Sequence, residues 1–469
     1  MTLPATFKYE SPERVMGSSV DCSLQPLAGS SSVEDSIRRL RYLSPDHISA
    51  TTSLESVPFK VNATTGNFNT THLENGGSIT MHEGRASYTT PDVVGPYNAA
   101  IAYLAGVSIL NQVTEQTFAS PASGALYHRN AGFSPRGGYN SRPAFSTYYT
   151  PAGTVTDASS INKLTSFLAT NVWAGGGMVG EHGIEWRQGA RGIGMPHNSV
   201  KTAGEGAKPI SLKTSLGAWE QIEICTDDAL ISPQTHLMAR SAVSGLLRLL
   251  EQDPRGRITG DLPIATIPLQ AFHEASKDST LKTKVPVLFG GELTQMSSLD
   301  IQRRYIEAML TLSGSSPERR FPHFERIGLT AAMNVLDTLA QPGESRLHEL
   351  AGVLEIAARH VRLTEKLGRG AILSKDNPQA WSVNTAYDFP LYSTSALKYW
   401  SKIQDEITKD ILAKAKRASA SNHPHGTVSD LRATAIREYG PGVTFVAPAA
   451  IKVGDKQVFA FQSPYQTAA

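Results

Sequence analysis

The stretch "NGGSITMHEGRASYTTPD" (Asn75–Asp92) decides the fold. Ile79 and Met81 alternate with polar residues, and this period of two predicts a strand with one packed face and one open face. Similar short runs continue to about residue 226, separated by clusters of Gly, Pro and Asn. Short runs separated by such turn-forming clusters are typical of an antiparallel sheet rather than of βαβ units. We therefore predict an antiparallel, curved sheet over about 75–226, with "WEQIEICTD" (219–227) as its clearest further strand.

The open face of the first strand raises a question of chemistry. A metal-dependent transferase would carry carboxylates there, because oxygen anions are the ligands that hold Mg²⁺ firmly. The stretch offers acids at Glu83 and Asp92, and its other chemically active side chains are His82, Arg85 and Ser87. The alternation also predicts that His82 and Ser87 lie on the concave face of the sheet.

Long amphipathic runs follow the strands. Apolar residues recur near helical spacing in "HLMARSAVSGLLRLLEQ" (236–252), "SSLDIQRRYIEAMLTLSG" (297–314) and "SRLHELAGVLEIAARHVRLTEKLG" (345–368). The second run begins with a capping box formed by Ser297 and Asp300. Strands first and helices after predict an α+β fold.

The last part of the chain has its own pattern. A helical run at 401–419 is followed by the strand candidates "VTFVAP" (443–448) and "QVFAF" (457–461). We therefore expect one large domain over residues 1–400 and a small C-terminal domain over 401–469.

Composition limits the classes of function. The chain has 469 residues, 40% of them hydrophobic, and 44 basic against 42 acidic residues give a net charge of +2. Nothing in this balance predicts a nucleic-acid or membrane partner. Two cysteines outside any C-x-x-C spacing do not indicate a zinc or redox site. With no apolar leader and no run of 18 apolar residues, we expect a cytoplasmic protein.

Local motifs by themselves do not identify a function. "GGGMVG" (175–180) fits G-x-G-x-x-G, but "EHGIEWRQG" after it is a poor helix start, so we interpret the match as accidental. His423 and His425 are more typical of a polar loop than of a metal site, and Arg303 and Arg304 of the solvated face of a helix. The chain has no G-x-S-x-G elbow and no Walker loop.

The order and spacing of longer segments are more specific. Nine landmarks resemble, in the same order, those of the Pup–protein ligase and Pup deamidase/depupylase family, up to about Trp400. They are "ERVMGSSVD", "RYLSPDHIS", "NGGSITM....ASYTTPD", "LYHRNAG", "SFLATNVWAGGGMVG", "RQGA", "WEQIEICTDDAL", "SLDIQRRYIEAM" and "TAYDF".

The resemblance implies a glutamine-synthetase-like fold, in which a curved antiparallel sheet backed by helices holds ATP and Mg²⁺ on its concave face. It also implies a chemistry that joins the C-terminal glutamate of Pup to a substrate lysine, or reverses that bond. Such chemistry needs carboxylates to hold metals against phosphate oxygens and an acid near the reacting carbonyl.

Carried over by position, the family's acidic residues are mostly substituted. The first strand has Ser19 at the first of two acidic positions and Asp21 at the second. The essential aspartate falls on His82, or on Met81 if the frame slips by one, and a glutamate at a metal or nucleotide position falls on Ser87. The segment "NSRPAF" (140–145) has no acid where the family has one, and a further acid falls on Arg191. Two nucleotide-facing positions hold Gln221 and Glu223.

These substitutions lead to our main hypothesis, a catalytically degenerate family member (a pseudoenzyme) with a binding or regulatory role, no metal and no cofactor. Arginines near the old site would form a cationic cleft for an acidic peptide or a Pup-like protein. They are Arg85, Arg142, Arg187 and Arg191.

Two alternatives stay open. One is an active ATP- and Mg²⁺-dependent carboxylate–amine ligase with relocated ligands. Its candidate ligands are Asp21, His82, Glu83, Glu181 and Glu185. The other is a structural subunit that self-assembles through its helical half.

Overall fold

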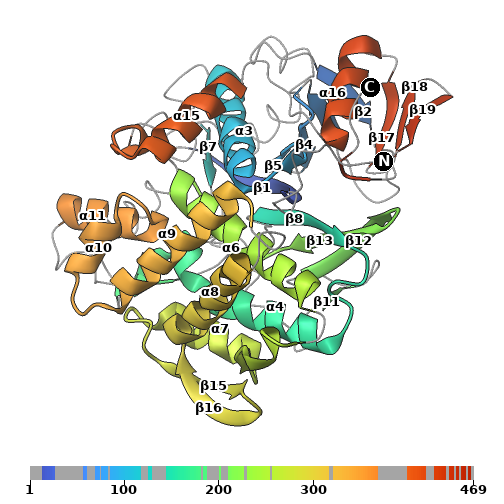
Figure 1. Cartoon of the computed structure of the whole chain (residues 1–469). Coiled ribbons are helices and arrows are strands. Elements are labelled where there is room, and N and C mark those ends of the chain that lie inside the picture. The colour runs from blue at the N-terminus through green and yellow to red at the C-terminus, as the bar shows by residue number, and fades with distance from the viewer. Residues whose placement is uncertain are drawn as a thin grey trace.

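The fold combines one large, mostly antiparallel sheet, whose strands are not in sequence order, with a layer of helices (Figure 1). The computed structural model describes residues 13–26, 56–60, 69–73, 75–82, 85–117, 125–128, 144–180, 183–186, 200–201, 210–226, 230–253, 256–315, 321–367, 399–418, 427–439, 443–447, 450–453, 456–460 and 463–465.

The main sheet has eleven strands in the described part of the chain. They are β1 (Val15–Pro26), β2 (Ser56–Lys60), β3 (Asn69–Leu73), β4 (Ser78–His82), β5 (Arg85–Thr89), β6 (Val93–Val94), β7 (Ala125–His128), β8 (Ala144–Pro151), β11 (Val200–Lys201), β12 (Ile210–Leu216) and β13 (Trp219–Ile224). The order is β11-β12-β13-β8-β1-β5-β4-β3-β2, with β6 and β7 also paired to β1. The predicted antiparallel sheet and the α+β class are confirmed, except that β11 runs parallel to β12.

Three smaller sheets lie outside it. They are formed by β9 (Met178–Gly180) with β10 (Gly183–Glu185), by β14 (Ile264–Ala265), β15 (Lys284–Phe289) and β16 (Glu292–Ser297), and by β17 (Val443–Ala447), β18 (Ala450–Val453) and β19 (Lys456–Ala460). The glycines of "GGGMVG" lead into the strand β9 and not into a helix, so the motif is not a dinucleotide-binding loop.

The helices are α3 (Pro96–Thr117), α4 (Ala158–Thr170), α6 (Pro233–Gln252), α7 (Pro268–Lys277), α8 (Ser298–Ser315), α9 (His323–Ala340), α10 (Ser345–Leu350), α11 (Glu355–Leu367), α15 (Glu406–Ala418) and α16 (Val428–Tyr439), with short 3₁₀ turns η2 (Val172–Ala174) and η3 (Thr259–Asp261). Ser297 caps α8 as predicted, since the Asp300 backbone N–H donates to Ser297 Oγ over 3.2 Å, and the Ser297 hydroxyl donates to Asp300 Oδ2 over 2.6 Å.

Two expectations about helices were wrong. The stretch 75–226 also contains α3 and α4, which the strand pattern did not predict. The run 345–368 is not one helix, because it breaks between α10 and α11. Tertiary contacts fix that break: Val353 O accepts hydrogen bonds from the hydroxyls of Ser232 and Thr235, and the Glu355 carboxylate accepts the backbone N–H groups of Ile231 and Ser232.

One face of the sheet packs against the helices. Met16, Tyr148 and Ile222 are register partners on three adjacent strands, and all three are fully buried in the main core. Alternation therefore assigns Gly17, Thr147 and Glu223, which pair in the next row, to the opposite face. We call this opposite face the polar face.

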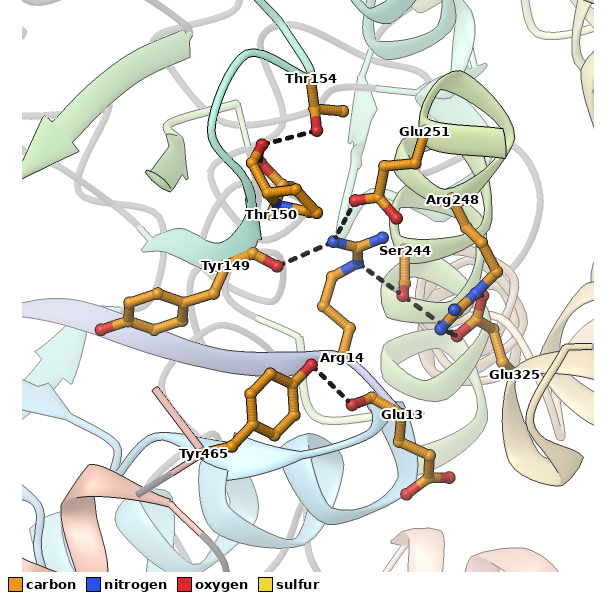
Figure 2. Close-up of polar contacts among 11 residues, drawn as sticks. Glu13, Arg14, Tyr149, Thr150, Thr154, Ser244, Arg248, Glu251, Glu325 and Tyr465 are labelled. Atoms are coloured by element: carbon orange, nitrogen blue, oxygen red, sulfur yellow. Dashed lines mark hydrogen bonds and ion pairs between the residues drawn. The ribbon is translucent and has the colours of Figure 1, made fainter. Parts of the chain in front are cut away.

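The helix side also holds a buried network of charges around the start of β1 (Figure 2). The Arg14 guanidinium donates to Glu251 Oε1 over 2.8 Å and to Ser244 Oγ over 3.3 Å. The Ser244 hydroxyl in turn donates to Glu325 Oε2, and the Glu325 carboxylate also pairs with Arg248 over 3.1 Å. These contacts join β1, α6 and α9.

The C-terminal helices α15 and α16 both contact the rest of the protein. On α15, Asp410 accepts a hydrogen bond from the Tyr97 hydroxyl of α3. On α16, Val428, Leu431 and Ile436 pack on the β1 and β8 residues Val15 and Tyr149. The domain boundary at residue 400 stays a prediction. Among the described helices, none is long and apolar enough to cross a membrane.

Candidate functional site on the polar face

Hydroxyl groups occupy the centre of the polar face. Ser19 on β1 and Ser87 on β5 lie with their Oγ atoms 3.1 Å apart, and Thr89 Oγ1 donates to Ser19 Oγ over 3.2 Å. Ser19 is 1% exposed, so its hydroxyl is fixed by these neighbours rather than by solvent. We call these three residues the hydroxyl cluster; it is uncharged and contains no carboxylate.

The backbone register places several other predicted residues on this face. Asp21 pairs with Ser87, and His82 pairs with Arg85, at positions whose parity matches the hydroxyl cluster. The predicted sharing of one face by His82 and Ser87 agrees with this register. The side chains of Asp21, His82 and Arg85 are outside the described part of the structure.

Other predicted site residues are not described at all. They are Glu83, Arg142, Glu181, Arg187 and Arg191, together with His423 and His425 of the polar loop. Glu185 lies in β10, where only its backbone is described. The cationic cleft formed by arginines therefore stays a prediction.

The two residues at the family's nucleotide positions lie on β13, which is separated from β1 and the hydroxyl cluster by β8. Gln221 Nε2 donates to the Tyr149 hydroxyl over 3.2 Å. Glu223 is 8% exposed, pairs in register with Thr147, and accepts the Cys225 thiol over 3.3 Å. Gln221 is therefore a neutral donor and Glu223 an acid that is mostly removed from solvent.

An ion pair that the sequence did not reveal lies at the end of the polar face. Arg432 on α16 donates to Asp92 Oδ2 over 3.1 Å, and both side chains are mostly buried. Asp92 Oδ1 lies 3.1 Å from the position that a Cβ on Gly17 would take. The backbone N–H of Asp92 donates to Ser429 Oγ, and its carbonyl accepts from Thr427 Oγ1. Because 340 residues separate Asp92 from Arg432, no local spacing could have shown the pair.

Electrostatics at this end follow from burial. Removal from water raises the pKa of Asp92, and Arg432 opposes that shift. The pKa of the Tyr149 hydroxyl is also raised, first by burial and then by the Asp92 charge. His72 on β3 has its pKa lowered to about 4 by burial and by the nearby Arg432. A neutral histidine and an un-ionised tyrosine therefore surround one ion pair at neutral pH.

The described donors do not form a metal site. No group of three His, Cys, Asp or Glu side chains comes together within the described ranges. Hydroxyls are weaker ligands for Mg²⁺ than carboxylates, and Asp92 is already paired with Arg432.

Fold and face together define a class. The family resemblance implies a glutamine-synthetase-like arrangement, an antiparallel sheet backed by helices on one face with a polar face on the other; here α16 also packs on the end of the polar face, against Val15 and Tyr149. The comparisons make the assignment specific, because the family "Pup-ligase protein" matches residues 24–447. The chain therefore belongs to the Pup-ligase family, and the match extends beyond the landmarks that end near Trp400.

Individual relatives agree with this assignment. The chain is 24% identical over 388 residues to the Pup deamidase/depupylase of Mycolicibacterium smegmatis (strain ATCC 700084 / mc(2)155), covering 79% of this chain and 72% of the relative. In fold it is similar to the ligase PafA in its complex with the prokaryotic ubiquitin-like protein Pup, with a TM-score of 0.75, 16% identity, and coverage of 97% of this chain and 89% of PafA. PafA in complex with ADP gives a TM-score of 0.68 at 16% identity, covering 94% and 93%.

Proposed function

We propose that this chain is a catalytically degenerate member of the Pup-ligase family that binds a Pup-like protein or another acidic peptide in a regulatory role. The family membership supports a Pup-related pathway. A solved structure of similar fold is a complex with Pup, which supports a Pup-like partner.

The hydroxyl cluster is the observation that carries the proposal. The resemblance assigns a metal-binding acid to Ser19 and a glutamate to Ser87, and these two hydroxyls instead hydrogen-bond to each other. Clustered carboxylates repel one another unless a cation neutralises them. A chain that no longer binds Mg²⁺ is therefore more stable when these carboxylates are replaced by neutral groups. A hydroxyl pair satisfies itself without metal.

A binding role would rely on positive charge that the metals once supplied. The four candidate arginines would pair with carboxylates through bidentate contacts, and convergence in a partly water-excluded cleft would strengthen their field. The cleft is expected to take the acidic tail of a Pup-like protein without ATP.

Two assays test the proposal. Incubation with ATP, Mg²⁺, Pup and a lysine substrate should give no conjugate, and Mg-ATP should not raise the melting temperature. A nucleotide at a hundred times its dissociation constant would add about 2.7 kcal/mol of stability. A metal-dependent conjugate, or such a stabilisation, would instead favour the active-ligase alternative with Asp21, His82, Glu83, Glu181 and Glu185 as ligands.

Binding needs its own measurement. A Glu-rich peptide should bind more weakly at high salt, and replacing Arg85 and Arg191 together by Ala should weaken binding at least about tenfold, or 1.4 kcal/mol. The matched control replaces Arg303 and Arg304, which lie on the outer surface of α8. Equal affinity in both double variants would contradict the cleft.

A further inference from the structure

The hairpin β15–β16 has an open edge. Its strands are joined by Gly290 and Gly291, whose φ angles of 59° and 83° fit the two-residue turn that matches strand twist. It projects at the periphery of the molecule, at the bottom of Figure 1. The sheet order is β14-β15-β16, so no strand within the described ranges pairs with the outer edge of β16.

The register identifies the outward backbone groups of β16. In a two-residue hairpin the closing pair, Phe289 with Glu292, exchanges both hydrogen bonds, and bonded pairs then alternate along the ladder. Leu293 and Gln295 fall in the non-bonded rows, so their N–H and C=O groups point away from β15. Natural edge strands are usually protected by Lys, Pro or a bulge. The strand "ELTQMS" has none of these, and its one charge is Glu292 at the tip.

Exposed apolar side chains concentrate on the same small sheet. Among the described residues, the large hydrophobic side chains that are exposed are Ile267 (40%), Leu288 (44%), Leu293 (72%) and Tyr439 (41%). The first three lie in or beside this sheet, and Leu288 is directly opposite Leu293. Single exposed apolar residues are ordinary, but a row of them beside an unpaired edge marks an interaction surface.

We propose that β16 pairs antiparallel with β16 of a second copy of this chain, about a two-fold axis through Thr294. This register pairs Leu293 with Gln295 of the partner subunit, and the symmetry repeats the pair, so all the outward backbone groups of these residues are satisfied. The pairing also places a strand of the second copy beside the exposed side chain of Leu293, which lies opposite Leu288.

Charge favours a second copy over an unrelated strand. The root of the hairpin exposes Lys282, Lys284 and Asp300 and is basic on balance, whereas its tip exposes Glu292. Antiparallel pairing places the acidic tip of each hairpin toward the basic root of the other, so unlike charges approach. The hairpin is therefore complementary to itself in backbone groups, apolar surface and charge.

The oligomeric state tests this pairing. Sedimentation velocity over a wide concentration range should show a reversible dimer. Leu293→Lys and Gln295→Pro should each weaken it at least about tenfold, and proline here keeps the β15–β16 ladder because the Gln295 N–H points outward. Tyr439→Ser, which removes an exposed side chain on α16, is the matched control and should dimerise normally. A monomer at every concentration, or a dimer unaffected by both hairpin variants, would overturn the proposal.

Cross-linking tests the register. In a non-bonded antiparallel pair the Cα atoms are about 4.5 Å apart, within the range of a disulfide. Thr294→Cys should form a disulfide-linked dimer under mild oxidation, whereas Gln295→Cys, displaced from the two-fold axis, should cross-link far less. Equal cross-linking of the two variants, or none in Thr294→Cys, contradicts this register.

Discussion

The two faces of the main sheet differ in the charge of their buried polar groups: the helix side holds ion pairs near the start of β1, whereas the centre of the polar face holds hydroxyls. On the helix side, Arg14, Arg248, Glu251 and Glu325 form a buried network in which each charge has a partner of opposite sign (Figure 2). On the polar face, the centre is the uncharged hydroxyl cluster around Ser19. This chain therefore keeps paired buried charges where strands meet helices, and has hydroxyls at Ser19 and Ser87, two of the positions where the family resemblance implies acids.

The largest expected effect comes from breaking the helix-side network. Glu325 is fully buried against Arg248 and Ser244, so Glu325→Gln leaves a buried guanidinium without its counter-charge. Removing one partner of a buried pair costs about 3–5 kcal/mol, measurable by urea unfolding.

The control is the exposed pair Arg303–Asp337. Asp337→Asn should change stability by about 0–1 kcal/mol, because exposed pairs are screened by solvent. If both variants lose the same small amount, the helix-side charges do not hold β1, α6 and α9 together, and the comparison between the faces fails.

A smaller effect concerns His236, a buried base beside the positive charge of Arg240. Burial lowers the pKa of His236 well below its usual value, and the Arg240 charge lowers it further. Well above pH 6.5 the His236 imidazole is neutral in both the folded and the unfolded state, so it does not change the free energy of unfolding with pH. As the pH falls below 6.5 only the unfolded state is protonated, and stability falls by about 2 kcal/mol between pH 7 and pH 5.

His236→Phe isolates this contribution, since an aromatic ring at 236 can still pack against Tyr103 but cannot titrate. The difference in unfolding free energy between pH 7 and pH 5 should be smaller in the variant by that amount. An identical pH dependence in both proteins would mean that other groups cause the acid loss.

The last test concerns the polar face itself. The double change Ser19→Asp with Ser87→Glu puts two carboxylates where the hydroxyls now touch, and because Ser19 is buried, desolvation and mutual repulsion should destabilise the protein by about 3 kcal/mol or more at pH 7. Mg²⁺ should restore this loss in the variant while leaving the natural chain unchanged. The neutral control is Ser19→Asn with Ser87→Gln, which has similar bulk and no charge. Equal responses of all three proteins to Mg²⁺ would contradict the idea of a lost metal site.

Only part of the site was accessible to sequence reasoning. The alternation around Ile79 placed Ser87 and His82 on one face correctly, because the period of two is fixed by the backbone alone. The ordered landmarks gave the family, because spacing along the chain survives substitution of single residues. The Asp92–Arg432 pair was missed, because α16 reaches the sheet only through the folded arrangement of the chain.

The sequence by itself determined the α+β class, the strand pattern of β4, β5 and β13, the cap of α8 and the absence of acids at Ser19 and Ser87. These are local properties, fixed by backbone periodicity, capping and residue identity. Only the tertiary structure decided the helix α3, which is buried against the sheet, α6 and α15 and so has little amphipathic signal. It likewise decided the break before α11, because the hydroxyls of Ser232 and Thr235, more than a hundred residues away in the chain, bind the Val353 carbonyl that a continuous helix would have used internally.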